Sequence, residues 1–266
     1  MKTINMDKKN SNYILIGMII FLIAILNIFN AYNFLSNCSG ENISLQDIII
    51  YIIYGFGENS KTTFIDILRF AIPYLLTIFL CGIYIENMLE TGTKYIQIIR
   101  YKGYKYWLRS NIKRLFLYII FIFIIYYFLL VIICLLFVKN TTGITDFFYK
   151  FNLYENFNIS FYKIVIYQYF INIFLTLNVI LIEIFLSLLL KDTIKSYIFV
   201  NLLIFIFSTL GTYRIYNPFM ISRHKFICHI YKISPVTTIF FSFITCILLY
   251  VSIIKLIKSI IRRDEI

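Results

Sequence analysis

The sequence has few of the side chains that build catalytic or metal sites. It holds only two histidines, His224 and His229, which lie with Cys228 in one short stretch. A protein zinc site usually needs three or four ligands, so a surface or interfacial loop is the better interpretation of this stretch. No Gly-x-Ser-Gly sequence occurs, as an intramembrane serine protease would need, and no histidine lies within an apolar segment to serve a metal-dependent membrane protease. We therefore expect no enzyme and no metal.

The five cysteines show no paired spacing of the metal-binding kind. Three of them lie inside apolar runs and are interpreted as small apolar filling residues. Two others fall in predicted outer segments and could pair, but two cysteines do not make a disulfide framework. The three are Cys81, Cys134 and Cys246, and the two are Cys38 and Cys228.

Charge is also scarce, and apolar residues are abundant. Charged residues make up 14% of the chain and hydrophobic residues 61%, whereas soluble domains are roughly 45 to 50% apolar. The mean hydropathy is +0.83. A net charge of +12 would suit nucleic acid, but the basic residues lie between apolar runs, where membrane orientation already explains them. We expect a membrane protein that binds lipid and no nucleic acid.

Six apolar segments are predicted to be transmembrane helices, in an all-α integral membrane protein whose single domain covers residues 1–266. The first is too long for the apolar region of a signal peptide, and no cleavage site closes it, so we expect it to be retained. Pro73 is tolerable in the second. The short fifth follows the fourth after "KDTIKS", which predicts a tight helical hairpin. The spans are residues 13–35, 67–85, 115–138, 161–190, 197–210 and 237–257.

The distribution of Lys and Arg predicts the orientation. If the N-terminus is cytoplasmic, sixteen basic residues fall in inner segments, eight in outer segments, and Arg69 within a span. Inner loops carry the excess of Lys and Arg, so both termini are expected in the cytoplasm. The whole chain is then a multi-pass protein of a cell membrane.

The cytoplasmic segment of residues 86–114 is the most informative part. Apolar residues cluster from Tyr95 to Ile99, between Gly92 and a turn at Gly103, which predicts a short amphipathic helix. Trp107 is expected near the lipid headgroups. An ordinary interfacial helix on anionic lipid is an equally good interpretation of this pattern.

This segment resembles the cytoplasmic loop of ABC-2 type transporter permeases in four features. They are an acidic residue ending the second span, a glycine about six residues later, an amphipathic helix and a basic run. These features are Glu86 and Glu90, Gly92, and "TKYIQIIRYKGYKYWLRSNIKR". The six-span plan and the chain length are similar to those of small permeases of lantibiotic immunity and bacitracin-type resistance exporters. Residues 101–104 stand where the family has a proline.

The resemblance implies a bacterial plasma-membrane permease subunit that exports an amphiphilic compound or antimicrobial peptide. A separate ABC ATPase subunit would bind ATP and Mg, so this chain holds no cofactor, and a second copy or a homologous permease would complete the transporter. The loop would be the coupling helix, with apolar residues filling a groove of the ATPase and basic residues meeting its acidic groups. The implied coupling residues are Glu86, Glu90, Gly92, Lys94, Ile96, Ile99, Arg100, Lys102 and Trp107.

Ionisable residues within spans point to the interior, because each costs roughly 2.5 to 3.5 kcal/mol at mid-bilayer. Glu183 has no obvious partner nearby in the sequence. We expect it to face a partner helix, a dimer seam or water in the transporting interior. Asp66 and Arg69 lie three apart and can meet on one helix face, either as a local neutralising pair or, slightly less favoured, as a substrate contact.

Two alternatives remain. "GFGENSKTT", Gly55 to Thr63, is similar to a phosphate loop whose last glycine is Ser60, and "DIIIYIIY" before it could be a strand. It lies in an outer segment and no second nucleotide motif follows, so we reject it. The other is a stand-alone membrane immunity or accessory protein that binds peptide or lipid without ATP, in which residues 86–114 only anchor to lipid.

Overall fold

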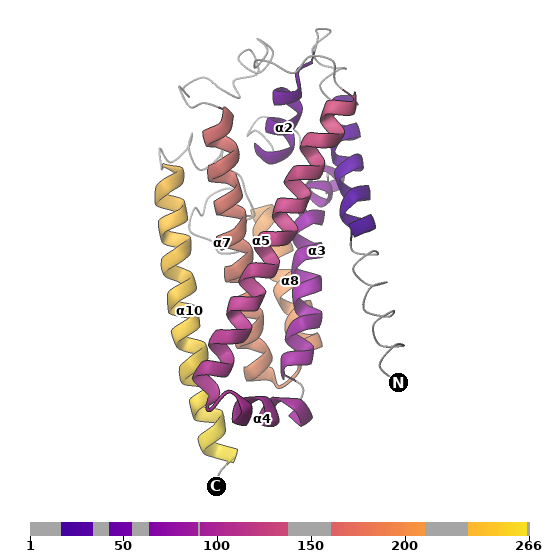
Figure 1. Ribbon diagram of the computed structural model, residues 1–266. Coiled ribbons are helices and arrows are strands. Elements are labelled where there is room, and N and C mark those ends of the chain that lie inside the picture. The colour runs from indigo at the N-terminus through magenta and orange to yellow at the C-terminus, as the bar shows by residue number, and fades with distance from the viewer. Residues whose placement is uncertain are drawn as a thin grey trace. The chain divides into compact units, whose positions relative to one another are not determined.

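The computed structural model describes residues 17–33, 43–54, 64–89, 91–137, 161–210 and 234–264. Within these ranges the regular structure is α-helical and contains no strand (Figure 1). An N-terminal helix covers Gly17–Asn33. The others are α2 (Leu45–Tyr54), α3 (Phe64–Leu89), α4 (Thr91–Arg100), α5 (Tyr104–Phe137), α7 (Phe161–Leu190), α8 (Thr193–Leu210) and α10 (Pro235–Asp264).

The predicted all-helical character is confirmed in the described residues. Three helices of the described parts are long and apolar enough to cross a membrane: Tyr104–Leu136, Phe161–Leu190 and Val236–Ile260. Three shorter apolar helices accompany them, at Gly17–Asn33, Pro73–Leu89 and Thr193–Ile204. Each of the six predicted spans therefore falls on a helix wherever the structure describes it.

The chain forms two compact units. Unit 1 comprises Met1–Pro73 and Phe123–Val165, and unit 2 comprises Tyr74–Ile122 and Ile166–Ile266. In unit 1, the Asn27 side-chain amide donates a hydrogen bond to the buried Tyr126 hydroxyl over 2.8 Å. This bond joins the N-terminal helix to the second half of α5.

Helix α2, also in unit 1, corrects one interpretation of the sequence. The segment "DIIIYIIY" is helical, so the idea that it forms the strand of a nucleotide-binding unit is wrong. The helix begins with a reciprocal cap: the Ser44 N–H donates to Asp47 Oδ2 over 2.9 Å, and the Asp47 N–H donates to Ser44 Oγ over 3.2 Å. Such a cap satisfies amides that a helix start leaves unpaired.

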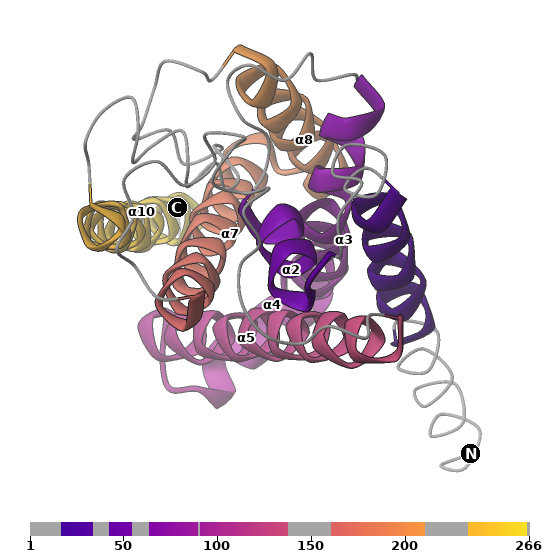
Figure 2. The ribbon, with the colours of Figure 1, turned by 90° about the horizontal axis from the view of Figure 1, so that it is seen from above.

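In unit 2, α7 and α10 lie side by side in both views (Figures 1 and 2). The Asn178 side chain of α7 donates a hydrogen bond to the Ser242 carbonyl of α10 over 3.0 Å. Phe174 and Phe243 make an edge-to-face ring contact with centroids 5.7 Å apart. The Cys246 thiol donates to the Phe174 carbonyl over 3.7 Å. Aromatic packing and buried polar groups together fix this pair of helices.

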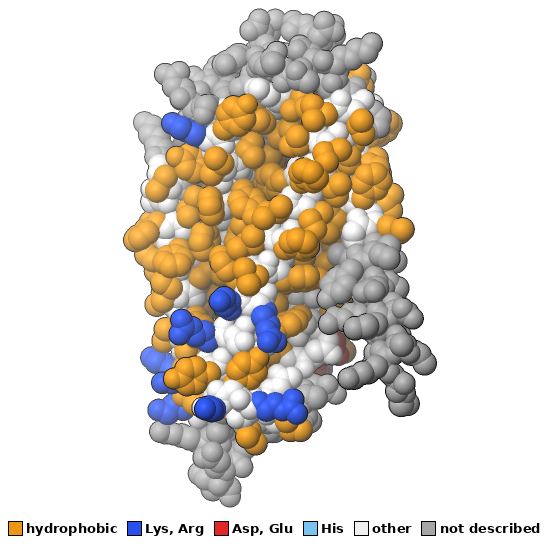
Figure 3. All heavy atoms as spheres, in the orientation of Figure 1, with side chains coloured by type: hydrophobic (Ala, Val, Ile, Leu, Met, Phe, Trp, Pro, Cys, Tyr) orange, Lys and Arg blue, Asp and Glu red, His pale blue; other side chains and the backbone are white. Residues whose placement is uncertain are grey.

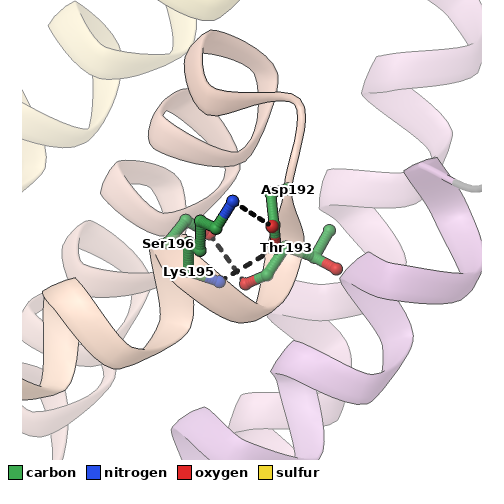
Figure 4. Close-up of polar contacts among 4 residues, drawn as sticks. All are labelled: Asp192, Thr193, Lys195 and Ser196. Carbon is green, nitrogen blue, oxygen red and sulfur yellow. Dashed lines mark hydrogen bonds and ion pairs between the residues drawn. The ribbon is translucent and has the colours of Figure 1, made fainter.

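The predicted hairpin between the fourth and fifth spans is present. Only Lys191 and Asp192 separate α7 from α8. Lys191 has a positive φ of 53°, the left-handed conformation that commonly ends a helix. The Asp192 carboxylate then caps α8 by accepting a hydrogen bond from the Lys195 N–H over 3.0 Å (Figure 4). Because the cap begins the helix at Thr193, α8 starts four residues before the predicted fifth span.

Candidate functional site

Helix α4 is the short amphipathic helix that the sequence predicted. It ends in two hydrogen bonds, from the Lys102 N–H to the Ile99 carbonyl and from the Gly103 N–H to the Ile98 carbonyl, each 3.0 Å long. This pair is the Schellman termination of a helix. Lys102, at φ 57°, occupies the left-handed position, and Gly103 follows at φ 134°. The chain thus reverses within three residues into α5, and α4 lies across the end of that helix (Figure 1).

A series of partly buried side-chain hydrogen bonds anchors α4 to its neighbours in unit 2. The Trp107 indole N–H of α5 donates to Gln97 Oε1 of α4 over 3.0 Å. The Asn111 side chain donates to the Trp107 carbonyl over 2.9 Å and accepts from the Tyr84 hydroxyl of α3 over 2.7 Å. Net contributions of about 0.5 to 1.5 kcal/mol per bond are typical. These three hydrogen bonds therefore connect α4, α5 and α3 through their side chains.

A second set of contacts holds the turn after α4. The Arg114 guanidinium donates to the Tyr101 hydroxyl over 3.0 Å, and the Ser110 hydroxyl makes a longer contact of 3.4 Å with the same oxygen. Tyr101 belongs to the short turn of residues 101–103 between α4 and α5. Here hydrogen bonds to α5 hold the turn.

The opposite surface of α4 carries apolar side chains without cover. Ile96 is 53% exposed and Ile99 is 77% exposed. They lie three residues apart and therefore share one face of the helix. Arg100 and Lys102 beside them are exposed as well. In Figure 3 the Lys and Arg side chains of unit 2 gather at the α4 end of the visible face.

The remaining predicted coupling residues are placed as follows. Glu86 is exposed in the last turn of α3. Trp107 is fully buried, so it supports α4 from beneath and offers no surface to a partner. Gly92 lies in α4, as does Lys94, whose side chain is outside the described residues. Glu90 lies outside them altogether.

Glu183 of α7 occupies the interior of unit 2. It is 1% exposed, and its Oε1 lies 3.0 Å from the position that a Cβ on Gly82 of α3 would take. The Tyr197 ring of α8 lies 3.3 Å from that position and contacts Phe79 of α3 edge-on, with centroids 6.0 Å apart. The residue therefore faces partner helices of its own chain, one of the settings that the sequence suggested.

The hairpin tip closes directly beyond Glu183. The Ser187 hydroxyl donates to the Glu183 carbonyl over 2.7 Å. Ser187 and Ser196 contact each other through their hydroxyl groups across α7 and α8. The Lys195 amide lowers the pKa of Asp192 by hydrogen bonding to its carboxylate, and the Lys195 ammonium 3.2 Å away adds to this effect.

Other predicted sites stay untested. Asp66 and Arg69 lie in the unit 1 part of α3, but their side chains are outside the described residues. His224, Cys228 and His229 lie outside the described residues altogether. The described part of the chain contains no group of three or more His, Cys, Asp or Glu residues that could hold a metal ion. Cys81, Cys134 and Cys246 are free and buried, as expected of filling residues.

Several residues that organise these sites were missed from the sequence. Gln97 and Asn111 are polar residues among apolar ones, and that contrast was the available signal. On α7, Gln168, Asn172 and Thr176 recur every four residues and are all buried, so they mark one polar face of a transmembrane helix. Gly82 gave no signal, because its role depends on a side chain a hundred residues away.

Comparison of the chain with protein-family models, curated proteins and solved structures gives no match.

Proposed function

We propose that this chain is the membrane-spanning permease subunit of an ATP-driven exporter of the ABC-2 type. One observation carries the proposal: a short helix, α4, is hydrogen-bonded to α5, which is in turn bonded to α3, through partly buried side chains, while α4 exposes Ile96 and Ile99. A helix that transmits force from a separate subunit needs both properties. It must offer an apolar surface to a groove, and it must move together with the spans behind it.

In this proposal six helices span a bacterial plasma membrane, and both termini lie in the cytoplasm. A separate ABC ATPase holds ATP and Mg, and the chain itself performs no catalysis. Ile96 and Ile99 fill the groove of the ATPase, and the exposed Arg100 and Lys102 meet its acidic groups. A second copy or a homologous permease completes the path. An amphiphilic compound such as an antimicrobial peptide is the proposed cargo, on the strength of the family resemblance.

Co-purification of the ATPase tests the proposal. The double substitution Ile96→Asp and Ile99→Asp places two charges on the contact face, and it should release the ATPase while the protein stays inserted in the membrane. Leucine at both positions preserves the apolar surface and should retain the ATPase. Ile194→Asp is a matched control, because Ile194 is 62% exposed in the first turn of α8, where an acidic residue suits the helix dipole.

The rival function is a stand-alone membrane immunity or accessory protein. Its support is the same exposed pair, since isoleucines flanked by basic residues also suit a surface of anionic lipid. Under this alternative, no ATPase co-purifies, and the aspartate substitutions weaken only lipid contact. An ATPase that stays bound to the double aspartate variant would overturn the proposed contact face.

A membrane-impermeant maleimide tests the orientation. Cysteine placed at Ile99, in a chain with Cys38 and Cys228 replaced by serine, should react in inside-out vesicles and not in intact cells. The three buried cysteines of the described residues should stay unreactive. Labelling from outside intact cells would place α4 on the wrong side for any ATPase.

A further inference from the structure

The interior of unit 2 holds a carboxyl group that has no ionic partner among the described residues. Glu183 is 1% exposed, and no described Lys or Arg forms an ion pair with it. Its Oε2 atom has no hydrogen-bond partner among the described residues. The titratable groups that face it are Cys81 on α3 and Tyr197 on α8. Both are neutral acids, so neither supplies a positive charge.

An ionised carboxylate in this setting is costly. Transfer of an unpaired charge into apolar surroundings is so unfavourable that the group is neutralised or paired instead. Gly82 allows the carboxyl to lie against the α3 backbone, because any larger residue would carry a Cβ 3.0 Å from Oε1. Close helix packing thus excludes the water that would otherwise solvate the charge. A proton or a cation from outside must balance it.

The adjacent helix carries an unpaired side-chain oxygen at about the level of Glu183. Ser187 and Ser196 contact each other across the hairpin, and each helix rises about 1.5 Å per residue. Glu183 lies four residues before Ser187 on α7, and Asn201 lies five residues after Ser196 on α8. Glu183 and Asn201 are therefore at nearly the same level along the two helices. The Asn201 amide nitrogen donates to the Tyr197 carbonyl over 2.8 Å. Its Oδ1 atom is buried and accepts no hydrogen bond from any described residue.

A further unpaired oxygen lies on the same face of α7. Thr176 precedes Glu183 by seven residues, about two helical turns, and its buried hydroxyl has no partner among the described residues. Thr176, Glu183 and Ser187 therefore align along the helix. When the helices separate, these unpaired oxygens offer hydrogen-bond partners to entering water, which would carry protons to and from the carboxyl.

We propose that the α3–α7–α8 layer is a proton-binding site, in which Glu183 carries a proton at neutral pH and uses it as a hydrogen-bond donor within the layer. Binding transfers a proton from hydronium to the carboxylate: one O–H bond of hydronium breaks, one O–H bond forms on the carboxyl, and a water molecule is left. Release of that proton leaves a charge that the dry layer cannot hold, so the hairpin must separate from α3 to admit water or a cation. The site depends on no ATPase and stands apart from the proposed export function.

Infrared spectroscopy of the full chain in micelles of an alkyl glycoside detergent, which has no ester or carboxyl group, tests this site. A protonated carboxylic acid has a carbonyl stretching band that a carboxylate lacks. We expect the band at neutral pH in the wild type and its loss in Glu183→Gln, which keeps the shape and removes the acid. Glu86→Gln removes an exposed carboxyl of α3 and should leave the band unchanged.

Two further measurements sharpen the test. Asn201→Leu removes the acceptor at the same level, so it should shift the band to higher frequency without abolishing it. The band should also be insensitive to sodium and potassium. If the wild type has no band at neutral pH, if Glu183→Gln retains it, or if alkali cations abolish it, then the carboxyl is ionised or paired with a metal cation and the proposal is wrong.

Discussion

The Trp107 indole donates a hydrogen bond to the Gln97 side chain over 3.0 Å, and both residues belong to the chain of contacts that fixes α4 to α5. The ring is fully buried, whereas the Gln97 side chain is half-buried, so this contact is partly shielded from solvent. A partner that pushes on the exposed side of α4 would push on Trp107 behind it. The mechanical link between α4 and the long helices therefore depends on this pair.

Trp107→Phe should loosen α4 without unfolding the rest of unit 2. The substitution leaves the half-buried Gln97 oxygen without its donor, and loss of one such hydrogen bond typically costs about 0.5 to 1.5 kcal/mol. Hydrogen exchange of residues 96–100 should accelerate, while exchange in α7 stays unchanged. Tyr106→Phe is the control, since Tyr106 is 64% exposed in the same turn of α5. Equal acceleration in both variants would show that Trp107 does not anchor the helix.

Gly82→Ala should destabilise the packing of α3 against α7 and α8. The new methyl would lie 3.0 Å from Glu183 Oε1 and 3.3 Å from the Tyr197 ring, and such overpacking typically costs about 1 to 3 kcal/mol. Thermal unfolding in detergent measures the loss. Gly17→Ala is the matched control, because no atom lies within 4 Å of its new methyl. That variant should be neutral or slightly more stable, and equal losses at both positions would contradict the close contact.

The turn after α4 offers a gain in stability. Lys102 holds a positive φ of 57°, which costs a residue with a side chain roughly 1 kcal/mol and costs glycine little. Lys102→Gly should therefore raise the melting temperature. Gly103→Ala should lower it, because residues with a side chain rarely adopt the φ of 134° that Gly103 has. The added methyl would meet no neighbour, so the loss would come from backbone strain alone. A decrease in the first variant or an increase in the second would contradict the observed helix termination.

The cap of α8 should depend on pH. The Lys195 amide bonded to Asp192 lowers the pKa of that carboxyl below its unfolded value. The stabilisation is therefore complete above the unfolded pKa and is lost as pH falls through the folded pKa. Because the group is exposed, the effect should be small and confined to the hairpin. Hydrogen exchange of residues 193–196, compared at each pH with Asp192→Asn, should show wild-type protection at neutral pH that disappears in acid.

The sequence predicted the helices better than it predicted what holds them together. Each apolar run that was predicted as a span falls on a helix where the structure describes it, and Gly103 correctly marked the turn after α4. Both signals are local, because they depend on the length of an apolar run and on the residues of a turn. Helix α2 was missed, since its start depends on a reciprocal cap between Ser44 and Asp47 that a run of isoleucines obscures.

The candidate sites divide in the same way. Ile96 and Ile99 are exposed on one face of α4, as its amphipathic pattern indicated. The burial of Trp107 was not predicted, because an aromatic residue beside basic ones equally suits a membrane interface. The environment of Glu183 depends on Gly82 and Tyr197, two residues on other helices. Only the folded chain brings these residues together.

Photo-crosslinking from α4 in native membranes tests the central claim most directly. A photoreactive amino acid at Ile99, 77% exposed on α4, should form a covalent product with an ATP-hydrolysing subunit, identified by mass spectrometry. The same amino acid at Leu117, 54% exposed on the apolar part of α5, should give lipid products alone. If position 99 also yields only lipid products, α4 rests on the membrane and couples the chain to no ATPase.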